Sequence, residues 1–143
     1  MRRILFLCVA NSARSQMAEG IARAVAQSGV RVWSAGSDPR RVRPEAVTVM
    51  REIGIDISGQ RAKSIPEIPA DEVDTVVTLC AGNVCPILPV RAQSFHWEIA
   101  DPAATEGSEE ARLAAFRATR DELRRRISAL LAGESSEGQA GID

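Results

Sequence analysis

Apolar and polar positions follow one another along the chain in blocks that predict strands and helices in turn. Residues 3–9 form a continuous apolar run, which is typical of a strand buried on both faces of a parallel sheet. Residues 15–27 then carry apolar side chains at helical spacing. Four positions keep this spacing: Met17, Ile21, Ala24 and Val25.

The same pattern continues along the rest of the chain. Further strands are expected at residues 30–35, 73–79 and 94–100. Pro44 is well placed to open a helix that stops at Gly54, and Ser108 is expected to cap a long helix that ends near residue 131. Residues 81–90 are expected to form a loop or a short helix broken by two prolines. Strands that alternate with helices predict an α/β fold whose functional loops lie at the carboxyl ends of parallel strands.

Length and charge narrow the class of protein. The 143 residues fit one domain, which we place at residues 1–133, followed by a flexible C-terminal tail at residues 134–143. Eighteen basic residues against nineteen acidic ones give a net charge of −1, which argues against a nucleic-acid binder that relies on bulk positive charge. No apolar run approaches the about 20 residues of a membrane span. We therefore expect a protein that binds neither nucleic acid nor membrane. A monomer is expected, although the sequence itself does not determine the oligomeric state.

The cysteine content indicates a reducing compartment. The two arginines and apolar run at the start mimic a signal peptide, but polar residues 11–15 stop the run too early. Three cysteines are an odd number, unlike the even set of a secreted disulfide framework. The sequence therefore predicts free thiols in the cytoplasm.

A candidate oxyanion site lies where the first strand meets the first helix. Five residues separate Cys8 from Arg14. A loop that enters a helix N-terminus directs several backbone N–H groups into one concavity, which suits a tetrahedral oxyanion and favours a thiolate at Cys8. Arg14 offers two parallel donors to such an anion. The predicted loop consists of Cys8, Val9, Ala10, Asn11, Ser12, Ala13, Arg14 and Ser15.

Two side chains of this loop have expected supporting roles. Ser15 can form a hydrogen bond with the sulfur of Cys8, and Asn11 can brace the loop. The alternative is a buried cysteine followed by an ordinary helix start, because this spacing of cysteine and arginine arises often by chance.

The segment from Cys8 to Gly20 resembles the opening of the thioredoxin-coupled arsenate reductases, which share their fold with the low-molecular-weight tyrosine phosphatases. The resemblance extends from Arg3 to about Leu131. Other similar segments are Ser34-Ala35-Gly36, residues 54–58, Thr78-Leu79-Cys80, Cys85-Pro86 and residues 97–102. It implies a single three-layer α/β domain, with a four-stranded parallel sheet in the order 2-1-3-4 and helices on both faces. We expect no cofactor and no metal.

The resemblance also implies a relay of three cysteines. Cys8 attacks arsenate, Cys80 then attacks Cys8 and arsenite leaves, and Cys85 attacks Cys80 to leave a disulfide for thioredoxin. In the 2-1-3-4 order, Cys8 and Cys80 would lie at the ends of neighbouring strands about 5 Å apart. Phosphate and sulfate are the expected competing anions.

The spacing of the last two cysteines departs from the best-known family pattern, which has six intervening residues. Here four residues separate Cys80 from Cys85. Residues five apart in a helix have Cα atoms about 8–9 Å apart, whereas a disulfide needs less than about 7 Å. Any helix here must therefore unwind. Two alternatives remain open: passive packing of both thiols, or a zinc site with His96, which offers too few ligands.

Asp101 is the expected general acid. The resemblance assigns this role to the aspartate of an Asp-Pro pair, here Asp101-Pro102, which protonates the leaving oxygen. The alternative is a simple turn aspartate. The tyrosine phosphatases usually carry aromatic residues next, whereas this chain has Ala103, Ala104 and Thr105, which suits a bare inorganic oxyanion.

The resemblance also bears on whether a cation binds beside the Cys8 loop. Some family members bind potassium with residues that correspond to Asn11, Glu19 and Ser34. This chain carries Arg61 and Lys63 where the potassium-binding pattern has a hydroxyl and a carboxylate. We therefore expect no specific potassium, and Lys63 either takes the place of the ion and pairs with Glu19 or is a solvated lysine. The basic segment with Arg40, Arg41 and Arg43 is read as a solvated face.

The leading hypothesis is thus an arsenate reductase recycled by thioredoxin. A phosphatase acting on phosphotyrosine or another phosphorylated side chain is the second, and a metalloid or oxyanion binder without turnover is the third. The sequence leaves glutathione or mycothiol open as the reductant.

Overall fold

The structure is a computed structural model that describes residues 2–80 and 92–133. Three of the four strands in these residues are followed along the chain by an α-helix, as the sequence predicts. The elements are β1 (Arg3–Cys8), α1 (Arg14–Val25), β2 (Arg31–Gly36), α2 (Pro44–Arg51), β3 (Thr75–Thr78), β4 (Gln93–His96) and α3 (Glu109–Leu131). Short 3-10 helices add η1 (Ile65–Glu67), η2 (Ala70–Glu72) and η3 (Pro102–Ala104).

The strands form one parallel sheet in the order β2-β1-β3-β4, which confirms the predicted order. Leu7 of β1 pairs with Ala35 on one side and with Thr78 on the other. Cys8 therefore ends a central strand at the carboxyl edge of the sheet, where the functional loops of parallel sheets gather.

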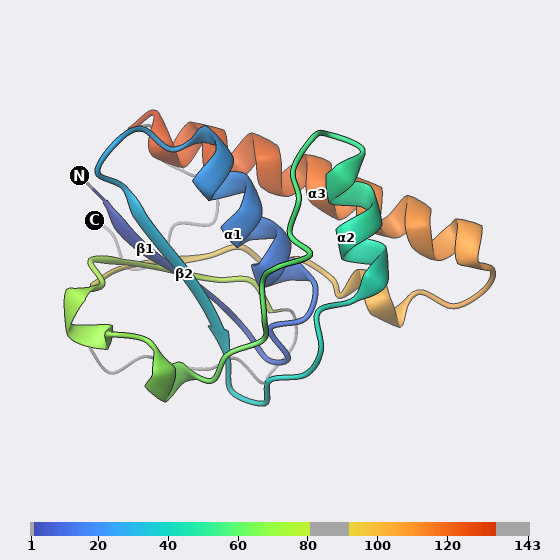
Figure 1. Ribbon diagram of the computed structural model, residues 1–143, viewed down its shortest axis with the longest axis horizontal. Coiled ribbons are helices and arrows are strands. Elements are labelled where there is room, and N and C mark those ends of the chain that lie inside the picture. The colour runs from blue at the N-terminus through green and yellow to red at the C-terminus, as the bar shows by residue number, and fades with distance from the viewer. Residues whose placement is uncertain (1, 81–91, 134–143) are drawn as a thin grey trace.

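Both faces of the sheet are covered, which confirms the three-layer α/β domain. Figure 1 shows α1, α2 and α3 together on one face, and the light-green ribbons of η1 and η2 on the other. Ile4 and Phe6 of β1 belong to the helix-side core, whereas Leu5 and Leu7 belong to the opposite one. Alternate side chains of β1 are thus buried on each face, which explains its unbroken apolar sequence.

The helix boundaries follow the sequence signals. Pro44 is the first residue of α2, and Gly54 has a positive φ of 80° shortly after the helix ends. Ser108 caps α3, because its side chain accepts a hydrogen bond from the N–H of Ala111 at 3.1 Å.

Some predicted details are wrong. The first helix ends at Val25 and not at residue 27. Met17 and Ile21 of α1 are fully buried, whereas Val25 is 42% exposed and Ala24 is also exposed, because the last turn of α1 extends past the core. The last two strands are shorter than predicted. β3 begins after η2, and β4 ends at His96, next to where its one described neighbour β3 ends at Thr78.

Other predictions lie outside the described residues. These are the loop or short helix at residues 81–90 and the tail at residues 134–143. Within residues 2–80 and 92–133, the structure has no helix of the length and apolar character required to cross a bilayer.

Candidate active site

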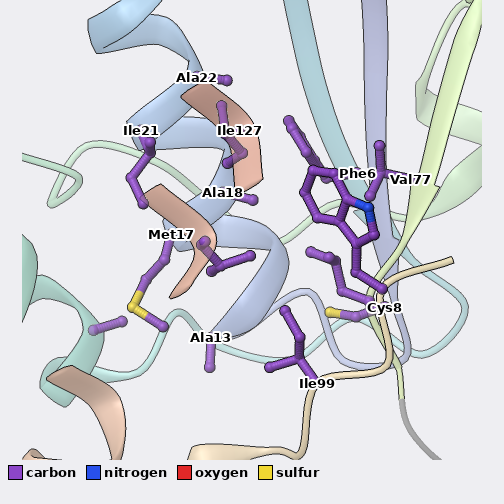
Figure 2. Packing of buried hydrophobic residues seen from close by; sticks show 14 of the residues in the cluster. Phe6, Cys8, Ala13, Met17, Ala18, Ile21, Ala22, Val77, Ile99 and Ile127 are labelled. Carbon is purple, nitrogen blue, oxygen red and sulfur yellow. The ribbon is translucent and has the colours of Figure 1, made fainter. Parts of the chain in front are cut away.

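The chain leaves the sheet at Cys8 and enters α1 at Arg14, so residues 9–13 form a loop between them. Asn11 has a left-handed backbone with φ of 49°, which is uncommon outside glycine and tightens the loop. The Cys8 Sγ atom accepts a hydrogen bond from the backbone N–H of Asn11 at 3.3 Å and lies 2.8 Å from Ser15 Oγ. Cys8 is buried, and Figure 2 shows it at one end of the core cluster with Ala13 and Ile99.

The carbonyl groups of the loop are occupied from outside. Those of Val9, Ala10 and Ser12 accept hydrogen bonds of 2.9, 2.8 and 2.9 Å from the backbone of segment 38–43. Within the described residues, the N–H groups of Ala10, Ser12 and Ala13 have no acceptor. Together with the first N–H groups of α1, they are donors that an anion can use.

Gly36, the last residue of β2, lies against the back of this loop. A Cβ atom at Gly36 would lie 2.4 Å from the carbonyl oxygen of Val9 and 2.9 Å from the backbone nitrogen of Asn11. The N–H of Gly36 donates to the carbonyl of Lys63 at 2.9 Å. The absence of a side chain therefore allows the loop to close over the sheet edge.

Arg14 is held in place by backbone carbonyls. Its Nη1 donates to the carbonyl oxygens of Ile99 at 2.9 Å and Leu79 at 3.3 Å. The residue is 8% exposed, and its Nε has no hydrogen-bond partner among the described residues. A buried guanidinium with an unused donor beside the Cys8 loop suits an oxyanion ligand, because buried donors are otherwise satisfied.

Asp101 lies beside this arginine. Its Oδ2 is 3.9 Å from Arg14 Nη2, and its Oδ1 accepts a hydrogen bond from the N–H of Ala103 at 3.0 Å. The Asp101 side chain is 44% exposed, so it faces both solvent and Arg14. The structure thus brings the predicted acid to the predicted oxyanion site.

A buried chain of polar contacts continues from the sulfur of Cys8. Asn11 Nδ2 donates to Ser15 Oγ at 2.7 Å and to Ser34 Oγ at 3.0 Å. Ser34 Oγ in turn donates to the carboxylate of Glu19. We call these residues the buried network: Cys8, Asn11, Ser15, Ser34 and Glu19.

The directions of these hydrogen bonds follow from the donors that each group has. The two N–H donors of the Asn11 amide are both used, so both serine oxygens act as acceptors toward Asn11. The carboxylate of Glu19 only accepts, so Ser34 donates to it. Ser15 is then free to donate its hydroxyl hydrogen to the sulfur of Cys8, which is the polarity that stabilises a thiolate.

Two cations neutralise Glu19, which is 3% exposed. Lys63 Nζ lies 3.4 Å from Glu19 Oε1, and Arg23 Nη2 lies 2.7 Å from Glu19 Oε2. The Lys63 side chain is only 16% exposed and also donates to the carbonyl of Arg61 at 2.9 Å. Lys63 is therefore a paired lysine at the end of the buried network rather than a solvated one. The sequence did not indicate Arg23.

The second cysteine lies close to the first in the topology. Cys80 follows β3, the neighbour of β1, and it is 1% exposed. The backbone N–H of Leu79 still donates to the carbonyl of Leu7 at 2.8 Å, so the two chains run together up to this point. Cys80 is disulfide-bonded, whereas Cys8 is a free thiol. Cys85 lies outside the described residues.

The remaining candidates have other contacts. His96 Nδ1 lies 2.8 Å from Thr78 Oγ1, across the β3–β4 pair, and this contact holds the two strands together. Arg40 pairs with Asp38 at 2.7 Å, and Arg43 pairs with Glu45 at 3.4 Å. Among residues 2–80 and 92–133, no cluster of three or more His, Cys, Asp or Glu side chains is arranged to hold a metal ion.

Sequence reasoning missed one polar residue that the site contains. Gln16 is fully buried and contacts Asn11 on one side and the segment at residues 60–61 on the other. The sequence feature that points to Gln16 is its position directly after Ser15 of the oxyanion loop. The structure adds that the first nine residues of this helix are all buried.

Comparison with known proteins gives one family. The profile of the low molecular weight phosphotyrosine protein phosphatases matches residues 3–140. An arsenate reductase of Halalkalibacterium halodurans is 46% identical over 126 residues, which is 87% of this chain and 91% of that protein.

Solved structures show the same similarity. An arsenate reductase in a phosphate-binding state superposes with a TM-score of 0.79 at 34% identity, covering 94% of this chain and all of the other. A thioredoxin-dependent arsenate reductase of Corynebacterium glutamicum has a TM-score of 0.61 at 29% identity, covering 91% of this chain and 63% of the other.

Proposed function

The chain belongs to the low molecular weight phosphotyrosine protein phosphatase family, and we propose that within it the chain is an arsenate reductase. One observation carries this choice. A free thiol, Cys8, lies in an anion-binding loop, while a second cysteine, Cys80, forms a disulfide at the end of the neighbouring strand. Phosphoester hydrolysis needs only the first thiol, whereas the reduction of arsenate needs a source of two electrons.

The first step is attack on arsenate by the thiolate of Cys8. A new S–As bond forms and an oxygen leaves as water, with the proton supplied by Asp101. The N–H groups of the loop and the free Nε donor of Arg14 bind the remaining oxygens. The position of Asp101, half-exposed and 3.9 Å from Arg14, is consistent with an acid that reaches the bound anion.

The second step transfers the electrons. Once thioredoxin has reduced the disulfide of Cys80, the freed Cys80 thiolate attacks the sulfur of Cys8, the S–As bond breaks, and its electron pair stays on arsenic, which leaves as arsenite. A Cys8–Cys80 disulfide results. Cys85 then attacks Cys80, which releases the Cys8 thiolate and leaves a Cys80–Cys85 disulfide. Thioredoxin reduces that disulfide and is itself oxidised, so two electrons are consumed for each arsenate.

The order of the strands supports this exchange. β1 and β3 are hydrogen-bonded neighbours up to Leu7 and Leu79, so each cysteine directly follows a paired position. Neighbouring strands are about 5 Å apart, within reach of a sulfur–sulfur attack after a local movement. The short spacing between Cys80 and Cys85 requires that any helix there unwinds.

Lys63 supplies the charge that a bound potassium ion would otherwise supply. It pairs with Glu19 at 3.4 Å and is connected through Ser34 and Asn11 to the Cys8 loop. The enzyme is therefore expected to need no specific potassium.

A phosphatase of the same fold is the second candidate, because the nucleophilic step on phosphate is the same. The residues after Asp101 argue against phosphotyrosine, since Pro102 is followed by Ala103 and Ala104, which offer no aromatic ring to hold the substrate. A weak phosphatase side activity is nevertheless expected. A protein that binds the metalloid without turnover is the third candidate.

The proposed setting is the cytoplasm, with the chain as a monomer. Arsenate is the substrate, phosphate and sulfate compete for its site, and thioredoxin is the protein partner. No cofactor, metal or nucleic acid takes part.

The decisive experiment measures arsenate-dependent NADPH oxidation with thioredoxin and thioredoxin reductase. The wild type should turn over many times, and Cys80→Ser and Cys85→Ser should not, while Asp101→Asn should slow the first turnover. Parallel assays with glutathione or mycothiol identify the reductant. Hydrolysis of an aryl phosphate that survives Cys80→Ser, without NADPH oxidation, would instead establish a phosphatase, and stoichiometric binding alone would establish a binder.

A further inference from the structure

Gln16 is a buried polar residue that the proposed mechanism leaves without a role. Gln16 is the third residue of α1, and its side chain is fully buried. Its Nε2 lies 2.9 Å from the carbonyl oxygen of Arg61, 3.1 Å from that of Asn11 and 2.9 Å from Asn11 Oδ1. Backbone carbonyls only accept, so the NH₂ group of Gln16 must face them.

That orientation determines how the side chain of Asn11 is turned. Asn11 Oδ1 faces the NH₂ group of Gln16 and also accepts from the backbone N–H of Lys63 at 2.8 Å. Because Gln16 Nε2 and the Lys63 backbone N–H are both donors, the side-chain oxygen of Asn11 must face them. The amide nitrogen of Asn11 therefore points the other way. The nitrogen then meets Ser15 and Ser34, as the structure shows.

Gln60 in turn holds Gln16. Gln60 Nε2 donates to Gln16 Oε1 at 2.7 Å and to the backbone carbonyl of Gln16 at 3.1 Å. The side-chain oxygen of Gln16 therefore accepts a hydrogen bond from Gln60, while its nitrogen faces Asn11. The pair connects residues 60–63 to the one left-handed non-glycine residue found in the described chain, Asn11.

We propose that Gln16, held by Gln60, is a positioning residue that fixes the Asn11 amide and thereby makes Ser15 a hydrogen-bond donor to Cys8. If the Asn11 amide turned over, its oxygen would face Ser15, and the serine hydroxyl would donate to that oxygen instead of to the sulfur. The Cys8 thiolate would then lose one of its two hydrogen-bond donors within the loop. The inference rests on the proposed function only in taking Cys8 as the nucleophile.

The test measures the rate of alkylation of Cys8 by iodoacetamide as a function of pH. The full reduced chain is used, and mass spectrometry of peptides reads Cys8 alone. Gln16→Met keeps the length of the side chain and removes both donors, so the midpoint of the pH profile should rise by about half a unit to one unit. Gln16→Glu places an acceptor against three acceptors, and the midpoint should rise by about one unit or more.

A double-mutant cycle separates this role from a merely structural one. If Gln16 acts through Ser15, then Gln16→Met should add almost nothing to the shift that Ser15→Ala already causes. Gln93→Met is the matched control, because Gln93 is an exposed glutamine on β4 whose side chain contacts Arg2. That variant should keep the wild-type profile.

Two results would overturn the proposal. The first is a midpoint for Gln16→Met that stays within about 0.2 units of the wild type, well below the effect of one lost hydrogen bond. The second is a shift of the same size with and without Ser15. Should Gln16→Met fail to fold, Gln60→Glu at the half-buried rim carries the test, with a smaller rise expected. The assay contains no arsenate, so a failure of the reductase hypothesis would leave this result interpretable.

Discussion

Two polar clusters of this molecule have similar groups but very different surroundings. The buried network around Asn11 consists of Cys8, Ser15, Ser34 and Glu19, all of which are almost fully shielded from solvent. The second cluster joins the end of α2 to α3 and consists of Glu52, Arg117 and Arg120, in which the side chains of Glu52 and Arg117 are exposed to solvent and that of Arg120 is buried. Arg117 and Arg120 each lie 2.8 Å from the Glu52 carboxylate. We call it the surface cluster.

The difference shows what burial adds to a hydrogen bond. In the buried network each donor has one acceptor and no water can replace it, so the direction of every bond is determined by its neighbours. Removal of one partner leaves an unsatisfied group, at a cost of about 1–3 kcal/mol. In the surface cluster, water and salt ions can replace a lost partner of the exposed Glu52 and Arg117 side chains, so the directions of their bonds carry little information.

The largest expected effect comes from a residue that supports the buried network without any side chain. Gly36→Ala places a Cβ atom against the Val9 carbonyl, where 2.4 Å separates them before any movement. The anion loop must shift, and we expect a loss of about 3 kcal/mol in the free energy of unfolding together with most of the turnover. Urea denaturation and the NADPH assay measure both.

Gly59→Ala is the matched control for this prediction, because a Cβ atom at Gly59 would have no neighbour within 4 Å. Equal losses in the two variants would show that the close approach at Gly36 is unimportant and that the loop is not supported from β2.

An intermediate effect is expected at the cationic end of the buried network. Lys63→Met removes one of the two cations on Glu19 and leaves Arg23. We expect the free energy of unfolding to fall by about 1–3 kcal/mol. Turnover of the variant should gain a response to potassium that the wild type lacks, because a small cation can replace the ammonium group.

Arg61→Met is the control for Lys63, since Arg61 forms an exposed ion pair with Glu67 at 2.9 Å. It should change neither stability nor the potassium response by much. A large, potassium-specific rise in the turnover of the wild type itself, absent with sodium, would refute the assigned role of Lys63.

The two clusters also differ in what the sequence reveals. The Cys8 loop could be predicted because its chemistry is local: a strand, a short spacing and a helix start determine which groups converge. The neighbours of Cys8 across the sheet came from the resemblance, since spacing along the chain does not determine strand order. The sequence does not distinguish a paired Lys63 from a solvated one, because its partner Glu19 lies 44 residues away along the chain.

Other features could not be predicted for physical reasons. Helical periodicity counts apolar residues, so it gave no reason to bury Gln16, which lies between Ser15 and Met17. β4 ends at His96, where its pairing partner β3 ends at Thr78. The apolar pattern of residues 94–100 alone does not show where the neighbouring strand ends. The surface cluster depends on how α3 crosses α2, and no pattern within either helix determines that.

The smallest expected effect belongs to the surface cluster. Hydrogen bonds from Arg117, and then from Arg120, hold the pKa of Glu52 below its ordinary value of 4.5. A carboxyl whose pKa is lower in the folded state stabilises the protein fully above its ordinary pKa. That contribution is lost as the pH falls through the lower, folded value. Glu52→Gln should therefore lower the Tm slightly at pH 7.

The pH and salt dependence of that difference is the sharper measurement. The Tm gap between wild type and Glu52→Gln should close as the pH falls below 4.5, and it should shrink at pH 7 in about 1 M salt, where the screening length is about 3 Å. With sodium chloride as the salt, the Lys63→Met gap should persist, because the Glu19 side chain is only 4% exposed and is little screened by diffuse ions. If the two gaps respond equally to salt, burial does not distinguish the two clusters, and the fixed hydrogen-bond directions around Asn11 lose their physical basis.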